Sequence, residues 1–228
     1  MGTKERYTKA AAELADVCAR AGRRPEEVVL VAVSKTVGPD EVACAIEAGA
    51  RDFGENRPDQ LMLKADQFED ANWHFIGNIQ SRRIRDIVGR AVLIHSLFEE
   101  RHARKIDEVA RERGVVQDVL LEVNVSGEES KSGRTPDDVR ELLECCRNLE
   151  NVRVRGLMTM APQGDLDVAR KTFAGLRSLR DELASELPAD EAGAFGELSM
   201  GMSEDWREAV EEGATIVRVG RAIFSEAF

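Results

Sequence analysis

The sequence predicts an α/β fold, a single (β/α)8 TIM barrel with an extra helix at the amino terminus. Eight short strand-like stretches alternate with amphipathic helical stretches, an order typical of parallel sheets. The first strand, residues 28–34, opens with six apolar residues, as in strands covered on both faces. The length of 228 residues is near the ~250 typical of this barrel. An open doubly wound sheet remains the alternative.

The predicted helices have apolar residues at helical spacing and recognisable start and stop residues. Proline opens three of them, at Pro39, at Pro58 and at Pro136, and Thr135 is the expected cap of the last. Glycine follows several others, as is usual at helix ends. In chain order, the predicted helices cover residues 3–21, 38–49, 58–68, 79–88, 99–112, a segment from 135, 167–186 and 203–212.

The predicted strands are short runs, most of them rich in β-branched and other apolar residues and bounded by turn formers. They cover residues 28–34, 51–54, 72–77, 91–96, 118–124, 152–158, 197–200 and 214–219, and a further helical turn follows at Gly220. No linker, internal repeat or low-complexity segment separates these elements. We therefore expect one domain over residues 1–228.

Composition limits the classes of function. Hydrophobic residues make up 43% of the chain, enough for a sizeable core, and the net charge of −11 disfavours binding to nucleic acid or an anionic membrane. No apolar run approaches the ~20 residues of a membrane span, and the first residues lead into an amphipathic helix. The four cysteines have no metal or redox spacing. We expect a cytoplasmic protein with reduced thiols.

Lys35 lies where the first strand ends, the edge at which α/β folds bind ligands. If its stem lies among the valines of this strand, burial lowers the pKa of its amine, and a neutral amine can form a Schiff base with a carbonyl. The alternative is a lysine that reaches solvent from the strand end.

The other predicted strand ends supply polar groups. They are Asn56, Gly77-Asn78, His95-Ser96, Asn124, Met158, Ser199 and Arg218 with Gly220. His74 and His95 are too isolated for a metal site, so we interpret them as core or hydrogen-bonded histidines. We expect no metal.

Two late strand ends are suited to bind an anion. The segment 198–203 has a hydroxyl at Ser199 and a glycine before a helix, and Gly220-Arg221 begins another helical turn. Barrels often hold phosphate in the loops after strands seven and eight. Together with Lys35, these features indicate a ligand with both an aldehyde and a phosphate, which fits pyridoxal 5′-phosphate.

Several long motifs resemble one protein family. They are Val-Ser-Lys-Thr at 33–36, Phe-Gly-Glu-Asn at 53–56, Trp-His-Phe-Ile-Gly at 73–77, Asn-Val-Ser-Gly-Glu-Glu-Ser-Lys-Ser-Gly at 124–133, Gly-Leu-Met-Thr-Met at 156–160, Leu-Ser-Met-Gly-Met-Ser-Glu-Asp-Trp at 198–206 and Val-Arg-Val-Gly-Arg-Ala-Ile-Phe at 217–224. With them the chain closely resembles the pyridoxal phosphate homeostasis proteins, also called the proline synthetase co-transcribed family. Residues 57–59 and 79–83 depart from the pattern commoner in relatives.

The resemblance implies a barrel like the N-terminal domain of alanine racemase, with pyridoxal phosphate on Lys35. It further implies that Ser199, Gly220 and Arg221 surround the phosphate and that Arg218 faces the pyridine nitrogen. Asn56 and Met158 are then expected near the ring.

Three functions remain open on the sequence. We favour a non-catalytic pyridoxal phosphate carrier that buffers or delivers the cofactor. Its expected partners are apo pyridoxal phosphate enzymes, and we expect it to be a monomer. A racemase needs acid–base groups on both faces of the substrate carbon, yet the only tyrosine, Tyr7, lies in the leading helix and the barrel uses the whole chain. The alternatives are a pyridoxal-phosphate-dependent amino-acid racemase and a cofactor-free Schiff-base aldolase.

Overall fold

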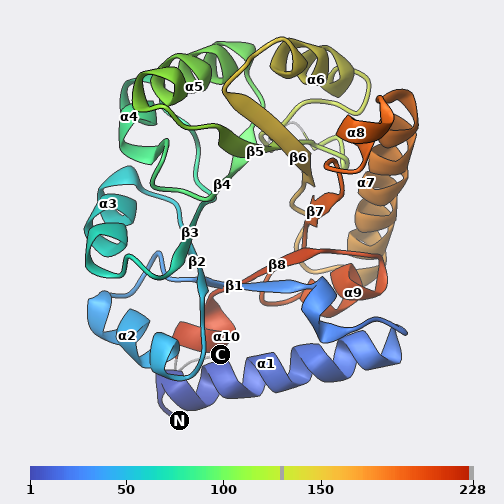
Figure 1. Cartoon of the computed structure of the whole chain (residues 1–228). Helices are drawn as coiled ribbons and strands as arrows, with labels where there is room; N and C mark the ends of the chain where they lie inside the picture. The colour runs from blue at the N-terminus through green and yellow to red at the C-terminus, as the bar shows by residue number, and fades with distance from the viewer. Residues whose placement is uncertain (129–130, 226–228) are drawn as a thin grey trace.

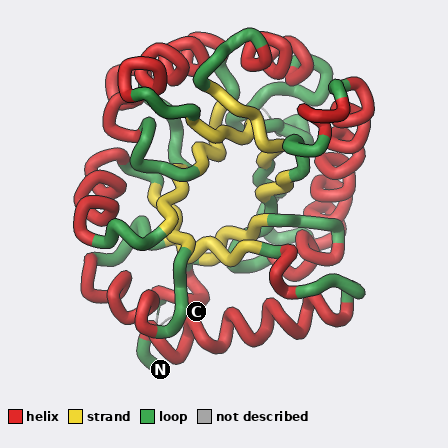
Figure 2. The backbone as a smooth tube through the Cα atoms, in the orientation of Figure 1, coloured by secondary structure: helices red, strands yellow, loops and turns green. Residues whose placement is uncertain are grey.

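Eight parallel strands close into a barrel in the computed structural model, which describes residues 1–128 and 131–225 (Figures 1 and 2). The strands are β1 (Val29–Val33), β2 (Asp52–Glu55), β3 (Asn72–Phe75), β4 (Leu93–Leu97), β5 (Gln117–Glu122), β6 (Val152–Met158), β7 (Glu197–Ser199) and β8 (Ile216–Val219). Neighbours in sequence are neighbours in the sheet, and β8 pairs with β1. The barrel prediction is confirmed and the open sheet is excluded.

The helices surround this ring of strands (Figure 2). They are α1 (Thr3–Arg20), α2 (Pro39–Glu47), α3 (Pro58–Gln67), α4 (Ile84–Ile87), α5 (Glu100–Arg113), α6 (Val139–Arg147), α7 (Leu166–Glu186), α8 (Ala189–Ala192), α9 (Trp206–Glu211) and α10 (Arg221–Phe224), with 3-10 turns at Pro25–Glu27 and Ser81–Arg83. The extra helix α1 is present and lies against α2, α9 and α10 (Figure 1). None of the helices described is long and apolar enough to cross a membrane.

Three helix predictions need correction. The helix predicted at 79–88 is a 3-10 turn followed by the single turn α4, and Ser81 is held there by a 3.1 Å hydrogen bond to His102 of α5. The helix predicted from Thr135 begins at Val139, although the Thr135 hydroxyl does accept the Asp138 N–H at 3.1 Å. The helix predicted at 203–212 is shorter, because residues up to Asp205 belong to a turn.

Residues 129–130, within the motif at 124–133, and residues 226–228 lie outside the described part of the chain. The short helix α8 was not predicted.

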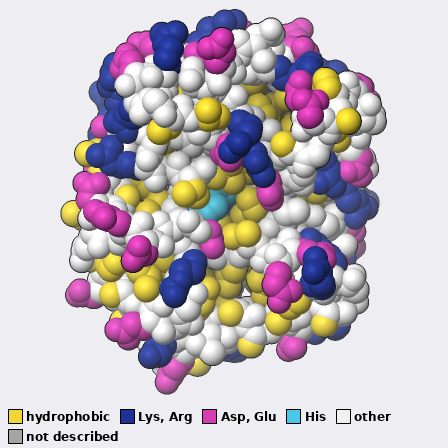
Figure 3. Space-filling model, in the orientation of Figure 1, with side chains coloured by type: hydrophobic (Ala, Val, Ile, Leu, Met, Phe, Trp, Pro, Cys, Tyr) yellow, Lys and Arg dark blue, Asp and Glu magenta, His cyan; other side chains and the backbone are white. Residues whose placement is uncertain are grey.

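Two apolar cores hold the barrel. The larger one lies between strands and helices and includes Phe53 and Trp73, whose ring centroids are 5.3 Å apart. The smaller one fills part of the barrel interior and consists of Val31, Val33, Leu93, Leu120, Met158 and Ile216. On the surface, Lys and Arg side chains are interspersed with Asp and Glu over the face viewed in Figure 3.

A buried ion pair fixes the chain immediately before Lys35. The ammonium of Lys64, on α3, lies 2.5 Å from Glu55 Oε1 and donates to the Ser34 carbonyl at 2.8 Å, while the Ser34 hydroxyl donates to the same carboxylate at 2.7 Å. Both charged side chains are fully buried. A buried pair is costly to break, because the remaining charge is left without a partner. This cluster therefore anchors the end of β1 and, with it, the backbone that carries Lys35.

We predict that Lys64→Met destabilises the fold by about 3–5 kcal/mol, because the Glu55 carboxyl stays buried without its counter-ion. Lys105→Met is the matched control, since it breaks a partly exposed pair with Glu108 and should cost below about 1 kcal/mol. Urea unfolding of both variants measures the difference. Equal, small losses for the two variants would contradict the anchoring role of Lys64.

Candidate functional site

A cavity of about 550 Å³ opens at the carboxyl ends of the strands. It is lined by Val33, Lys35, Asn56, Ile76, Gly77, Asn78, Met158, Met160, Pro162, Gln163, Gly164, Asp165, Leu166, Ala169, Met202, Ser203, Glu204, Asp205, Arg218, Gly220 and Arg221. Six of the seven residues predicted for cofactor binding are among them, and Ser199 is the exception. The first and last strands are neighbours, so the barrel closure itself brings Lys35 close to the residues after β8.

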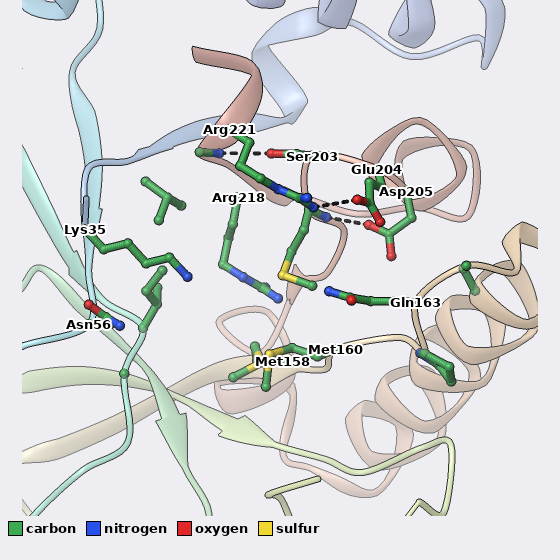
Figure 4. Close-up of a pocket in the computed structure, with 18 of the residues that line it drawn as sticks. Lys35, Asn56, Met158, Met160, Gln163, Ser203, Glu204, Asp205, Arg218 and Arg221 are labelled. Atoms are coloured by element: carbon green, nitrogen blue, oxygen red, sulfur yellow. Dashed lines mark hydrogen bonds and ion pairs between the residues drawn. The ribbon is translucent and has the colours of Figure 1, made fainter. Parts of the chain in front are cut away.

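Lys35 is exposed, so of the two interpretations left open by the sequence the structure supports the lysine that reaches solvent from the strand end. The reason is that the strand ends at Val33, and two residues later the chain is already at the open mouth of the barrel. Its side chain points into the cavity toward the same space as Arg218 (Figure 4). The amine is thus positioned by the anchored backbone at Ser34 and is accessible to a ligand.

The loop after β7 brings Ser203 to the cavity. Gly201 has φ +88, and a Cβ there would lie 2.6 Å from the Ala209 Cβ, so the turn requires glycine. The turn is closed by the Met202 N–H, which donates to Asp205 Oδ1 at 2.6 Å. Ser203 then accepts the Gly220 N–H at 3.3 Å, which joins the loop after β7 to the loop after β8 (Figure 4).

Ser199 is not brought to the cavity wall. It is fully buried in the barrel interior, where its hydroxyl lies 2.8 Å from His95 Nδ1 and accepts a 2.5 Å hydrogen bond from Arg218 Nη1. Alternate residues of a strand point to opposite faces, and the register places the Ser199 side chain inside the barrel. The motif at 198–206 contains both serines, Ser199 and Ser203. The sequence does not show the strand register that decides which of the two hydroxyls reaches the cavity.

Arg218 is a buried cation in the cavity floor. Only 4% of it is exposed, and its Nη2 donates to the Thr159 carbonyl at 3.1 Å. Burial lowers the pKa of Arg218 to about 10, against the opposing effect of the Asp205 and Glu122 carboxyls. The guanidinium therefore remains charged at neutral pH, and it can only donate hydrogen bonds.

Glu122, at the end of β5, is a buried carboxyl that sequence reasoning missed. Its Oε2 has no hydrogen-bond partner in the described part of the chain, and burial raises its pKa to about 7 although the charge of Arg218 acts in the opposite direction. In the sequence it follows three apolar residues and looks like the polar end of an ordinary strand.

The prediction of hydrogen-bonded core histidines is confirmed. His74 Nδ1 lies 2.9 Å from His95 Nε2, and both rings are buried inside the barrel. No group of three or more metal-ligating side chains occurs within residues 1–128 and 131–225.

Close backbone packing shapes the side of the cavity near Asn56. A Cβ on Gly77 would lie 2.1 Å from the Asn56 carbonyl oxygen, so only glycine allows the chain after β3 to lie against the chain after β2. Asn56, Gly77 and Asn78 consequently line the cavity together.

The chemistry of the cavity combines one accessible amine with a set of donors. Lys35, Arg218 and Arg221 carry positive charge, and the Ser203 hydroxyl and the Gly220 backbone lie between β7 and β8. Arg221 also lies 2.6 Å from Glu204 at the rim. Such a set suits a ligand that has an anionic group and a carbonyl group.

Comparison with known proteins defines the class. The alanine racemase N-terminal domain family matches residues 10–227. The alanine racemase of Clostridium difficile is 14% identical with a TM-score of 0.71, over 93% of this chain and 56% of that one. Since this identity is low, the likeness shows the fold alone: the protein is a barrel of the alanine racemase N-terminal type.

More similar proteins identify the family. The pyridoxal phosphate homeostasis protein of Aquifex aeolicus is 42% identical over 99% of both chains. PipY of Synechococcus elongatus, solved with pyridoxal phosphate bound, is 35% identical with a TM-score of 0.81, over 93% of this chain and all of that one. The chain belongs to the pyridoxal phosphate homeostasis protein family.

We predict that Glu122→Gln stabilises the protein at alkaline pH. The pKa of Glu122 in the folded state, about 7, is above the ordinary value of 4.5, so the stability gained from its protonation is complete below about pH 4.5 and is lost as the pH rises through 7. The variant should thus gain up to ~3 kcal/mol at about pH 8.5 and little at about pH 4.5.

Urea unfolding at both pH values measures this difference, and Glu150→Gln, at an exposed carboxylate, is the control that should change little at either. A Glu122→Gln variant with the same pH dependence as the native protein would show that this carboxyl is ionised in the fold.

Proposed function

We propose that this protein binds pyridoxal 5′-phosphate in the cavity and serves in its intracellular homeostasis, by buffering or delivering the cofactor without catalysis. The observation that carries the proposal is that the Lys35 amine shares one cavity with the Ser203, Gly220 and Arg221 donors. The names of the curated relatives and the cofactor in PipY support it.

The residues of the cavity fit the cofactor at both ends. Lys35 would hold the aldehyde end, since its amine can condense with an aldehyde and release one water without any oxidation or reduction. Ser203, the Gly220 N–H and Arg221 hold the phosphate, since charge-assisted donors bind it well. Arg218 would face the pyridine nitrogen, and Asn56 and Met158, which line the cavity, would lie near the ring. In this proposal Ser203 takes the phosphate role that the resemblance implied for Ser199.

Arg218 supports a non-catalytic role. When bound, pyridoxal phosphate can withdraw electrons from a substrate carbon, and a protonated ring nitrogen makes it a better acceptor. The Arg218 guanidinium cannot give this nitrogen a negative partner, and its positive charge opposes protonation there. Tyr7, the only tyrosine, is buried in α1 and does not line the cavity, so it does not provide a second acid–base group.

The proposal extends to partners and location. We expect a cytoplasmic monomer, no nucleic acid or membrane partner, and apo pyridoxal phosphate enzymes as recipients of the cofactor.

Reduction with borohydride should fix the cofactor on Lys35. We expect native protein incubated with pyridoxal phosphate to gain one reduced pyridoxyl phosphate group, located by mass spectrometry on the peptide that contains Lys35. Lys35→Ala should lose this label and Lys131→Ala should keep it, because Lys131 is engaged with Glu128 and the Met160 carbonyl. A label that stays in Lys35→Ala, or is found on another lysine of the native protein, would refute the assignment.

The native protein loaded with pyridoxal phosphate should racemise or transaminate amino acids only negligibly. The measurement is turnover across the common amino acids, followed by chiral chromatography and by keto-acid formation. Sustained turnover that Lys35→Ala abolishes would favour the racemase alternative, which the family of the alanine racemase N-terminal domain makes reasonable.

A further inference from the structure

A chain of hydrogen bonds crosses the barrel interior from one end to the other. It links Asp52 Oδ1 to His74 Nε2 at 3.2 Å, His74 Nδ1 to His95 Nε2 at 2.9 Å, His95 Nδ1 to Ser199 Oγ at 2.8 Å and Ser199 Oγ to Arg218 Nη1 at 2.5 Å. Arg218 lies in the cavity floor, whereas Asp52 begins β2 at the opposite end of the barrel. The cavity is thus connected to a carboxylate on the far side.

The residues at the two ends fix the direction of the chain. Arg218 can only donate and an ionised Asp52 can only accept. If both histidines are neutral, only one arrangement gives every shared hydrogen an acceptor: Arg218 donates to Ser199, Ser199 to His95, His95 to His74, and His74 to Asp52. Both rings then carry their proton on Nε2 and accept at Nδ1.

The surroundings favour a neutral His95. His95 is fully buried, and burial holds its pKa well below the ordinary value, with the neighbouring His74 and Arg218 acting in the same direction. The side chain of Asp52 is 25% exposed and also accepts the Asn72 amide at 3.1 Å, so it is both hydrated and held in place.

We propose that Ser199, His95, His74 and Asp52 are positioning residues that orient Arg218 toward the ring end of the bound cofactor. Ser199 occupies one N–H of Nη1 and the Thr159 carbonyl occupies one of Nη2, which fixes the plane of the guanidinium. Ser199 therefore acts through Arg218 at the ring and not at the phosphate. This inference rests on the proposed binding of pyridoxal phosphate.

Ser199 could act on the ring end of the cofactor through Arg218, or on the phosphate directly. Comparing the binding of pyridoxal phosphate with that of pyridoxal, which has no phosphate, separates the two roles. Ser199→Ala should weaken the binding of both ligands by about tenfold and shift the visible absorption band, because Arg218 loses a charge-assisted hydrogen bond. Ser203→Ala, the matched serine of the cavity wall, should weaken only pyridoxal phosphate. If Ser199→Ala weakens pyridoxal phosphate alone, or neither ligand, the positioning role is refuted.

The direction of the chain can be tested without any cofactor. Nitrogen-15 NMR of the native protein should show His74 and His95 protonated at Nε2 and unprotonated at Nδ1. Asp52→Ala should change these signals, whereas Asp52→Asn keeps an acceptor oxygen and should change them little. Asp118→Ala, which removes a carboxylate paired with Arg153 on the neighbouring strand, is the control.

The outcomes separate this inference from the proposed function. A His95 ring protonated at Nδ1 would contradict the proposed direction of these hydrogen bonds, whether or not the protein binds pyridoxal phosphate. A native protein that shows the predicted histidine signals but binds neither ligand would refute the proposed function, and with it the role of the chain in positioning Arg218 for a cofactor.

Discussion

The positive charge of Arg218 inside the barrel is the constraint on which the site depends. A buried guanidinium loses its hydration, so its N–H groups need acceptors and its charge needs nearby carboxyls. The interior supplies the Ser199 hydroxyl, the Thr159 carbonyl and, in the vicinity, Glu122 and Asp205. The barrel interior therefore holds a chain of polar side chains from Arg218 to Asp52 beside a separate apolar cluster.

The same charge connects the fold to the proposed function. In the proposed binding mode, Arg218 would leave the pyridine nitrogen without an anionic partner, because it cannot accept a proton, and Lys35, which follows the adjacent first strand, would supply the amine for the aldehyde. The amine is accessible, but the backbone that carries it is anchored by a fully buried ion pair. Such an arrangement suits a protein that holds a reactive cofactor and releases it rather than one that uses it.

The fold could be predicted because eight strand-like stretches alternate with amphipathic helices, and Lys35 could be singled out because it follows the most apolar of these stretches. The choice between Ser199 and Ser203 could not be made, since it depends on strand register and on the turn at Gly201. Glu122 and Lys64 were missed because a charged residue on a strand or helix is ordinarily exposed. The segment 79–88 failed as a helix because contacts such as that between Ser81 and His102 hold it as a shorter turn.

The protonation state of the cofactor's ring tests the central claim most directly. Pyridoxal phosphate labelled with nitrogen-15 in the ring can be bound to the native protein and its chemical shift measured by NMR. An unprotonated pyridine nitrogen near neutral pH is the predicted result, because in the proposed binding mode Arg218 would donate to it and oppose a second positive charge. A pyridinium signal would contradict the account and show that the cavity prepares the cofactor for catalysis.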